Sequence, residues 1–304
     1  MSTRTEVSEW LPDSRREAER RFDRLVRENR FTISAFFPLN GIVLLVASAE
    51  GWLPEPLAFH GLLILSGTLV MRSPLVAGVA PVAKRKTVAA VGLLAAYAYG
   101  IEYVGVHTGW PYGRFEYVVD LGPALAGVPV GLPVFFIPLV VNAYLLVLLL
   151  LGDRADGGLG AAAVRLGAVI ALVLTMDVVL DPGAVALGFW RYFEPGAPVL
   201  GGLLSSAGGF YGVPLSNYAG WVLSSAVAVG LLDWGFDRRA LRERMSECEF
   251  MLDDMVSFVL LWGGLNLWFG NLVSVAVAGV IGAGLWRTDR FDADLIASQF
   301  GEGS

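Results

Sequence analysis

Long apolar runs dominate this sequence and limit what it can fold into. A helix needs about 20 mostly apolar residues to cross the roughly 30 Å hydrocarbon core of a bilayer. Hydrophobic residues make up 55% of the chain and charged residues only 16%, which is low for a soluble protein. The apolar runs are 31–49, 57–71, 87–106, 128–151, 161–180, 218–235 and 255–286. They predict an all-α polytopic membrane protein.

The last run, Met255–Trp286, is too long for one untilted helix. Gly270 lies in its middle, between Asn266 and Asn271. These residues predict two short helices joined by a tight turn. We therefore expect about eight transmembrane helices, with seven as the alternative.

The basic residues favour eight spans, because cytoplasmic loops carry an excess of Lys and Arg. An eight-span chain with its N-terminus inside places 20 of the 22 basic residues in the cytoplasm and only Arg114 and Arg191 outside. A seven-span chain would put the basic clusters flanking the last run on opposite sides. We expect both termini to be cytoplasmic, in a multi-pass protein of the cell membrane.

Two charged ends flank a single membrane domain. Residues 1–30 alternate arginines with acids and predict a cytoplasmic N-terminal helix. Residues 31–286 are expected to form one transmembrane catalytic domain, and residues 287–304 an acidic cytoplasmic tail.

Several classes of function are disfavoured. One cysteine and two histidines leave little material for a metal site, and the formal charge of −6 disfavours a nucleic-acid partner. No phosphate-binding loop, dinucleotide fingerprint or zinc-protease motif is present. We expect neither a metal nor a cofactor.

The two longest outer segments, 102–129 and 177–221, mix acids with aromatic residues, glycines and prolines. Solvated loops are usually polar, so these segments are expected to fold back at the membrane interface. An ordinary belt of Trp and Tyr at the headgroup level is the alternative.

Carboxylates in or near spans indicate function, because they are costly there. Glu102 lies near the outer end of the third span, Asp177 lies inside the fifth, and Asp181 is expected to end it before Pro182. Asp177 and Asp181 share a helical face. Two such carboxylates repel when both are ionised, so the pair is expected to hold a proton. The alternatives are that Asp181 only caps a turn and that Asp177 only bonds a neighbouring helix.

Other polar residues carry less weight. His107 is a candidate proton shuttle, although a lone interfacial histidine is more often structural. Asp233 and Asp237 lie close to Arg238 and Arg239, so ion pairing explains them. The pair at 253–254 lacks the third aspartate of a diphosphate-binding motif, which argues against a prenyltransferase.

Two blocks of sequence carry a family resemblance. One begins at Glu102, includes Thr108-Gly109-Trp110-Pro111-Tyr112-Gly113 and ends at Gly127-Val128-Pro129. The other runs from Leu180-Asp181-Pro182 through Tyr211-Gly212-Val213-Pro214 to Gly220-Trp221. In composition and order these blocks resemble the carotenoid hydratase family of membrane carotenoid-biosynthesis proteins, over roughly residues 87–221. Archaeal members add water to terminal alkenes of a C50 carotenoid.

The resemblance and the residues agree on acid-catalysed hydration. Asp177, Asp181 and Glu102 are the candidate proton donors and bases. Aromatic faces can stabilise the carbocation, and Asn217 and Thr108 can hold the water. The candidate substrate-binding residues are His107, Thr108, Trp110, Tyr112, Phe115, Tyr117, Asp120, Trp190, Tyr192, Tyr211, Asn217 and Trp221. The expected partners are a long-chain carotenoid and membrane lipid, with other carotenoid-biosynthesis enzymes as further candidates.

Three alternatives stay open. A carotenoid 1′-hydratase would act on lycopene-type ends. A cyclase would form the same cation and lose a proton instead of admitting water. A carotenoid-binding or transport protein would need a polar path with acids in both halves of the bundle, whereas here the acids cluster on one side.

Overall fold

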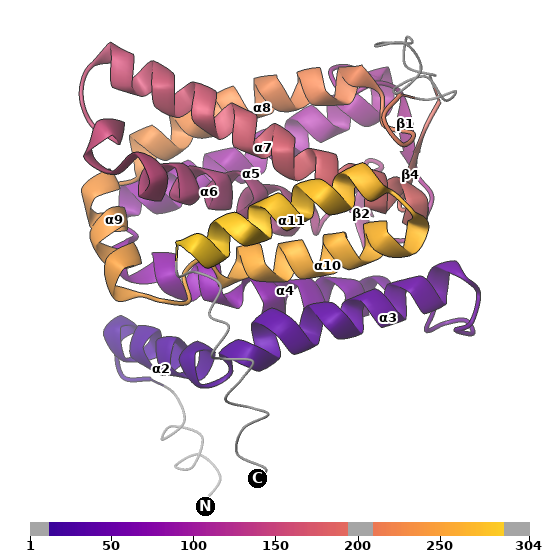
Figure 1. Cartoon of the computed structure of the whole chain (residues 1–304), viewed down its shortest axis with the longest axis horizontal. Coiled ribbons are helices and arrows are strands. Elements are labelled where there is room, and N and C mark those ends of the chain that lie inside the picture. The colour runs from indigo at the N-terminus through magenta and orange to yellow at the C-terminus, as the bar shows by residue number, and fades with distance from the viewer. Residues whose placement is uncertain (1–11, 194–208, 289–304) are drawn as a thin grey trace, which may run out of the picture.

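The computed structural model describes residues 12–193 and 209–288 of the chain. In this part the apolar runs form a bundle of helices arranged side by side (Figure 1). The bundle helices are α3 (Phe37–Ala49), α4 (Gly61–Val79), α5 (Arg85–Thr108), α6 (Leu132–Leu151), α7 (Leu159–Leu187), α8 (Leu215–Gly235), α10 (Asp253–Phe269) and α11 (Leu272–Arg287). A π-helical turn, η1 (Thr32–Phe36), leads into α3. The predicted helical class is confirmed.

Two further helices carry charge. These are α2 (Arg15–Glu28), before the bundle, and α9 (Arg238–Glu247), between α8 and α10. Short 3₁₀ turns follow α4 (η2, Ala80–Val82) and α6 (η3, Gly152–Ala155). The first 11 residues of the predicted N-terminal segment, and residues 289–304 of the predicted acidic tail, lie outside the described residues.

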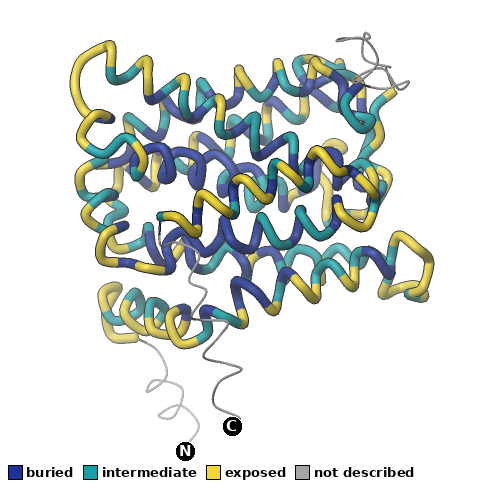
Figure 2. The backbone as a smooth tube through the Cα atoms, viewed as in Figure 1, coloured by how far each residue is buried: buried dark blue, intermediate teal, exposed yellow. Residues whose placement is uncertain are grey.

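Within the described residues, six helical stretches are long and apolar enough to cross a membrane, and α11 is a shorter apolar helix. Burial is greatest along α6 and at the start of α10 (Figure 2). The outward faces carry exposed apolar side chains such as Val88, Leu63 and Val280. Apolar surface of this kind suits contact with lipid.

The predicted break at Gly270 is confirmed. α10 ends at Phe269 with Gly270 in the left-handed region, at φ 76°, and α11 begins two residues later. The amides of Asn266 and Asn271 are buried, and they donate to the carbonyls of Val179 (2.7 Å) and Pro182 (3.2 Å). The two asparagines therefore attach the α10–α11 hairpin to α7.

α7 continues past the point where the sequence predicted its end. Asp181 and Pro182 both lie inside the helix, which ends at Leu187. Proline has no N–H, so it cannot bond the carbonyl four residues earlier. That carbonyl belongs to Val178, and the Ser274 hydroxyl of α11 donates to it at 2.7 Å. A neighbouring helix thus satisfies the freed carbonyl, as membrane bundles allow.

Buried ion pairs hold together the end of the bundle where α2 and α9 lie. Arg30 donates to both oxygens of Asp253 (2.8 and 3.0 Å), and Arg72 pairs with the fully buried Asp254. Asp233 pairs with Arg165 of α7. The sequence analysis expected its partners from the neighbouring Arg238 and Arg239, and of these Arg238 lies 3.6 Å away.

The opposite end of the bundle carries two short antiparallel strand pairs, which the sequence did not predict. β1 (Phe115–Tyr117) pairs with β4 (Trp190–Tyr192), and β2 (Ala124–Leu125) pairs with β3 (Val128–Pro129). β1 follows α5 and β4 follows α7, so the first pair joins the two segments that the sequence analysis predicted to lie on the outer side (Figure 1). This junction positions the candidate site.

Candidate functional site

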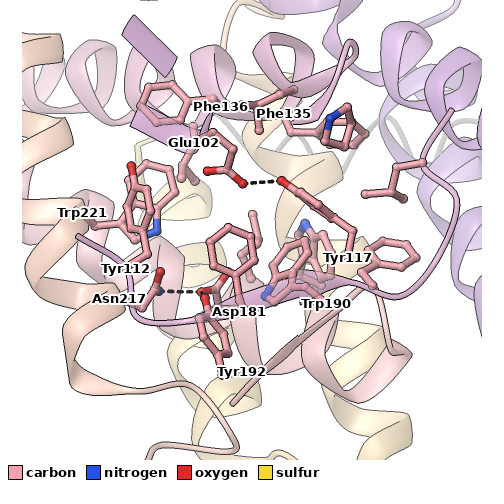
Figure 3. A pocket seen from close by; sticks show the side chains of 18 residues that line it. Glu102, Tyr112, Tyr117, Phe135, Phe136, Asp181, Trp190, Tyr192, Asn217 and Trp221 are labelled. Carbon is pink, nitrogen blue, oxygen red and sulfur yellow. Dashed lines mark hydrogen bonds between the residues drawn. The ribbon is translucent and has the colours of Figure 1, made fainter. Parts of the chain in front are cut away.

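A cavity of about 120 Å³ lies beneath the β1–β4 pair, at the strand-bearing end of the bundle. It contains side chains from α5, α6, α7, α8 and α10 as well as from the two strands. The lining is mostly aromatic and aliphatic, with two carboxylates (Figure 3). The lining residues are Glu102, Tyr112, Phe115, Tyr117, Leu121, Pro129, Leu132, Phe135, Phe136, Leu139, Leu180, Asp181, Phe189, Trp190, Tyr192, Asn217, Trp221 and Trp262.

The two carboxylates of the lining come from different helices. Glu102 of α5 accepts a hydrogen bond from the Tyr117 hydroxyl of β1. Asp181 of α7 accepts bonds through Oδ2 from Asn217 Nδ2 (2.6 Å) and from the Tyr192 hydroxyl (3.2 Å). In Figure 3, Glu102 and Asp181 lie on different sides of the group of rings. A guest in the cavity would therefore have carboxylates on two sides.

Asp177 lies one helical turn from Asp181, is fully buried and is not part of the lining. Its Oδ2 accepts a bond from the same Asn217 amide nitrogen at 2.9 Å. Asn217 therefore bridges the two aspartates with the two hydrogens of one NH₂ group. The other oxygen of Asp177, Oδ1, is buried without a hydrogen-bond partner among the described residues. Bridged carboxylates at this spacing repel when both are ionised, so one proton on the pair relieves the repulsion.

Strand alternation explains how the aromatic wall forms. The register pairs Phe115 with Tyr192 and Tyr117 with Trp190, and all four line the cavity. Successive side chains of a strand point to opposite faces. The residues between them, Glu116 and Arg191, form an ion pair and are not part of the lining. Ring centroids within the wall lie 5.7 to 6.4 Å apart.

Two tyrosines of the strand pair remain hydrogen-bond donors. Burial, and then the charge of Glu102, raise the pKa of the Tyr117 hydroxyl well above its usual value. Burial, and then the charge of Asp181, do the same for the pKa of Tyr192. Each hydroxyl keeps its proton and points it at the carboxylate beside it.

Small residues let a third tyrosine approach α8 closely. A Cβ on Gly220 would lie 2.4 Å from Cδ1 of Tyr112, so only glycine fits there. The Tyr112 hydroxyl shares a hydrogen bond of 2.7 Å with Ser224, one turn further along α8. Nearby, Trp221 stacks on Phe136 at 5.1 Å between centroids and closes that side of the cavity.

Five of the predicted substrate-binding residues lie outside the lining. His107 contacts the Tyr103 carbonyl, and the Thr108 hydroxyl donates back into its own helix. Trp110 is 58% exposed, and the Asp120 carboxylate accepts from the amide of Gly122. The Tyr211 hydroxyl accepts from the amide at position 273. The structure brings together the other predicted residues and leaves these five at the periphery.

The sequence analysis missed part of the wall. Phe135 and Phe136 of α6, Phe189 after α7, and Trp262 of α10 all line the cavity. Three of them lie within apolar runs, where a ring facing a cavity looks like a ring facing lipid. For Phe189 a weak signal was present, since it directly precedes the predicted Trp190.

Across the described ranges, no three His, Cys, Asp or Glu side chains are grouped in a way that could hold a metal ion. The polar groups of the cavity are carboxyls, hydroxyls, one amide and indole nitrogens. This set can donate and accept protons at a guest that is otherwise apolar.

The fold and the site together define a helical membrane protein with an acid-bearing, aromatic-walled cavity at one end of its bundle. A family model described as "Carotenoid biosynthesis protein" matches residues 59–285. A curated relative, bisanhydrobacterioruberin hydratase of Haloarcula japonica, is 56% identical over 299 residues, covering 98% of this chain and 96% of the relative. The chain belongs to the carotenoid biosynthesis protein family. No solved structure matches it.

Proposed function

We propose that this chain is a carotenoid hydratase, a hydro-lyase that adds water to the terminal C=C bonds of a C50 carotenoid and so converts bisanhydrobacterioruberin to bacterioruberin. The relative's name and its near-complete coverage at 56% identity support the reaction and the substrate. The observation that carries the proposal is the cavity, in which carboxyl groups face an otherwise apolar, aromatic space.

The first step is transfer of a proton from Asp181 to the terminal alkene. The π electrons of the alkene form the new C–H bond at the less substituted carbon. The other carbon becomes a tertiary carbocation, and Asp181 becomes a carboxylate. Asp181 is the proposed donor because it lines the cavity and shares Asn217 with Asp177. Repulsion within this pair keeps a proton on it, which makes Asp177 a positioning residue.

Ring faces stabilise the cation. Trp190, Tyr117 and Tyr192 all line the cavity beside Asp181. A desolvated cation over an aromatic face gains about 2 kcal/mol or more.

Water then attacks the cation and forms the C–O bond. Glu102 is the proposed base that takes the proton released by this water, since its carboxyl group lines the cavity from a different helix than Asp181 and is held in place by the Tyr117 hydroxyl. The products are a tertiary alcohol, neutral Glu102 and ionised Asp181. Proton exchange between these acids restores the starting state, so the reaction balances without an added oxidant or reductant.

The cavity fits the end of a carotenoid. A cavity of ~150 Å³ holds benzene, so 120 Å³ accommodates a branched end group of a few carbons. The rigid polyene is comparable in length to the bilayer thickness, and it would stay in the lipid beside the bundle.

We also propose eight membrane crossings, in the cell membrane, with both termini in the cytoplasm. Support comes from the basic residues, and from α2 and α9 lying at the end of the bundle opposite the strands (Figure 1). α10 and α11 are short but packed together as a hairpin. The segment 1–30 would then be cytoplasmic, 31–286 would be the catalytic domain, and the cavity would open near the outer surface.

The decisive experiment supplies the purified protein with bisanhydrobacterioruberin in H₂¹⁸O, with a chelator present and no nucleotide. A hydratase gives bacterioruberin with one ¹⁸O in each new hydroxyl. A cyclase gives a product without ¹⁸O, and a binding protein returns the substrate unchanged. A strict requirement for a divalent metal, flavin or nicotinamide would overturn the acid-catalysed route.

A further inference from the structure

A row of arginines on α2 lines a second hollow, far from the cavity. This arginine groove has a volume of about 580 Å³, within the ~300–1,000 Å³ common for ligand sites. Its residues come from α2, from the turn after α4 and from α9. They are Arg16, Glu19, Arg20, Asp23, Arg24, Arg27, Pro81 and Arg244.

The charges of the groove are unbalanced. Asp23 is neutralised by Arg244 at 2.6 Å and Arg27 at 3.4 Å, and Glu19 pairs with Arg15 at 2.6 Å. That leaves Arg16, Arg20 and Arg24, which form no hydrogen bond or ion pair with any described residue. Spaced four residues apart, they share one face of the helix with about 6 Å between neighbours. Three guanidinium groups in a row present donors to phosphate oxygens.

α2 is fixed in place, so the row is a preformed surface. Arg15 donates to the carbonyls of Ala80 (3.0 Å) and Ala83 (2.9 Å), next to Pro81. Val26 is 1% exposed against the bundle. Arg244 adds a contact from α9 through Asp23. Because other residues dock the helix, the three unpaired arginines are not needed for its attachment.

The position of the groove indicates the kind of ligand that it binds. α2 ends at Glu28, and the first membrane-type helical stretch begins at Thr32. Only residues 29–31 separate the two, so the row lies beside the membrane surface whichever way the chain is oriented. Basic groups at that level attract anionic lipid headgroups. We propose that the arginine groove binds the phosphate of anionic membrane phospholipids.

The test compares two triple variants of the full-length protein, purified in a neutral detergent. The first carries Arg16→Gln, Arg20→Gln and Arg24→Gln. The control removes the same charge from exposed positions at the same end of the bundle, through Arg85→Gln, Arg154→Gln and Arg239→Gln. Glutamine keeps helix propensity close to that of arginine, so both proteins should fold. Retained hydratase activity checks this.

The measurement is the thermal unfolding midpoint as a function of added phosphatidylglycerol, with phosphatidylcholine as the neutral lipid. A ligand that binds the folded state raises the midpoint in a concentration-dependent way. Each basic residue near an anionic surface contributes about fivefold in affinity. The groove variant should therefore bind phosphatidylglycerol on the order of a hundredfold more weakly than the unsubstituted protein, and the control should lose clearly less affinity.

Three outcomes would overturn the proposal. Equal loss of affinity in both variants would show that binding depends on net charge and not on the groove. Full stabilisation by inorganic phosphate at the same concentration would make the groove a site for free anions. Lipid could also stabilise the protein only when the chain is truncated after Thr288. In that case the acidic residues 289–304 would be the ligand of the groove in the full-length protein.

Discussion

Replacing Asp181 with asparagine keeps the size of the side chain but removes the proton that it is proposed to donate. The new amide oxygen can still accept from Asn217 and Tyr192, which bond the carboxylate at 2.6 and 3.2 Å. The new NH₂ group has no acceptor assigned to it, which costs about 1–3 kcal/mol when buried. The amount of folded protein must therefore be measured beside the rate.

The expected loss of rate follows from the proposed role of Asp181 as a general acid. Loss of a general acid lowers the rate typically by 10²–10⁴-fold, or about 3–5 kcal/mol in the activation barrier. Glu102→Gln should cause a loss in the same range. Asp177→Asn should be milder, because Asp177 is not part of the lining and acts through Asn217.

The assay measures bacterioruberin formed per amount of folded protein, with Glu116→Gln as the matched control. Glu116 lies between two lining residues of β1 but pairs with Arg191 outside the cavity, so its variant should keep normal turnover. Near-normal turnover in both Asp181→Asn and Glu102→Gln would place the chemistry elsewhere. A larger loss in Asp177→Asn than in Asp181→Asn would reverse their roles.

Three further outcomes are expected. Gly220→Ala should displace the Tyr112 ring, lower stability by about 1–3 kcal/mol and reduce activity. Gly230→Ala in the same helix, with open space at its Cβ, should be neutral. Unfolding and turnover measurements check both variants. Ser274→Ala should remove the donor to the carbonyl freed by proline and lower stability by about 1–3 kcal/mol in a denaturant titration, while turnover per folded protein stays normal. Reporter fusions after Gly235 and after Trp286 should both read as cytoplasmic, and disagreement between them would exclude eight crossings.

Composition and the lengths of the apolar runs were sufficient to predict the bundle helices, but not α9. The apolar runs mark most bundle helices to within a few residues, and Gly270 marks the turn between the last two. The acids were identifiable because a carboxylate inside an apolar run is rare and costly. The shared helical face of Asp177 and Asp181 followed from their spacing.

Long-range contacts could not be predicted in this way. The continuation of α7 through Pro182 depends on a serine nearly a hundred residues further along the chain. The β1–β4 pair joins segments that are distant in sequence, and each strand is only three residues long. Such short strands carry too little alternation to be recognised. His107 and Trp110 were included as candidates because they lie in the same sequence block as residues that line the cavity.

The size of the cavity has a consequence for how a long substrate is processed. A C50 carotenoid with two anhydro ends presents one end at a time to a space of about 120 Å³. After the first hydration the polyene must withdraw, reverse in the bilayer and return with its other end. Hydration should therefore be distributive, and a pulse of substrate should release the singly hydrated carotenoid before the doubly hydrated one accumulates.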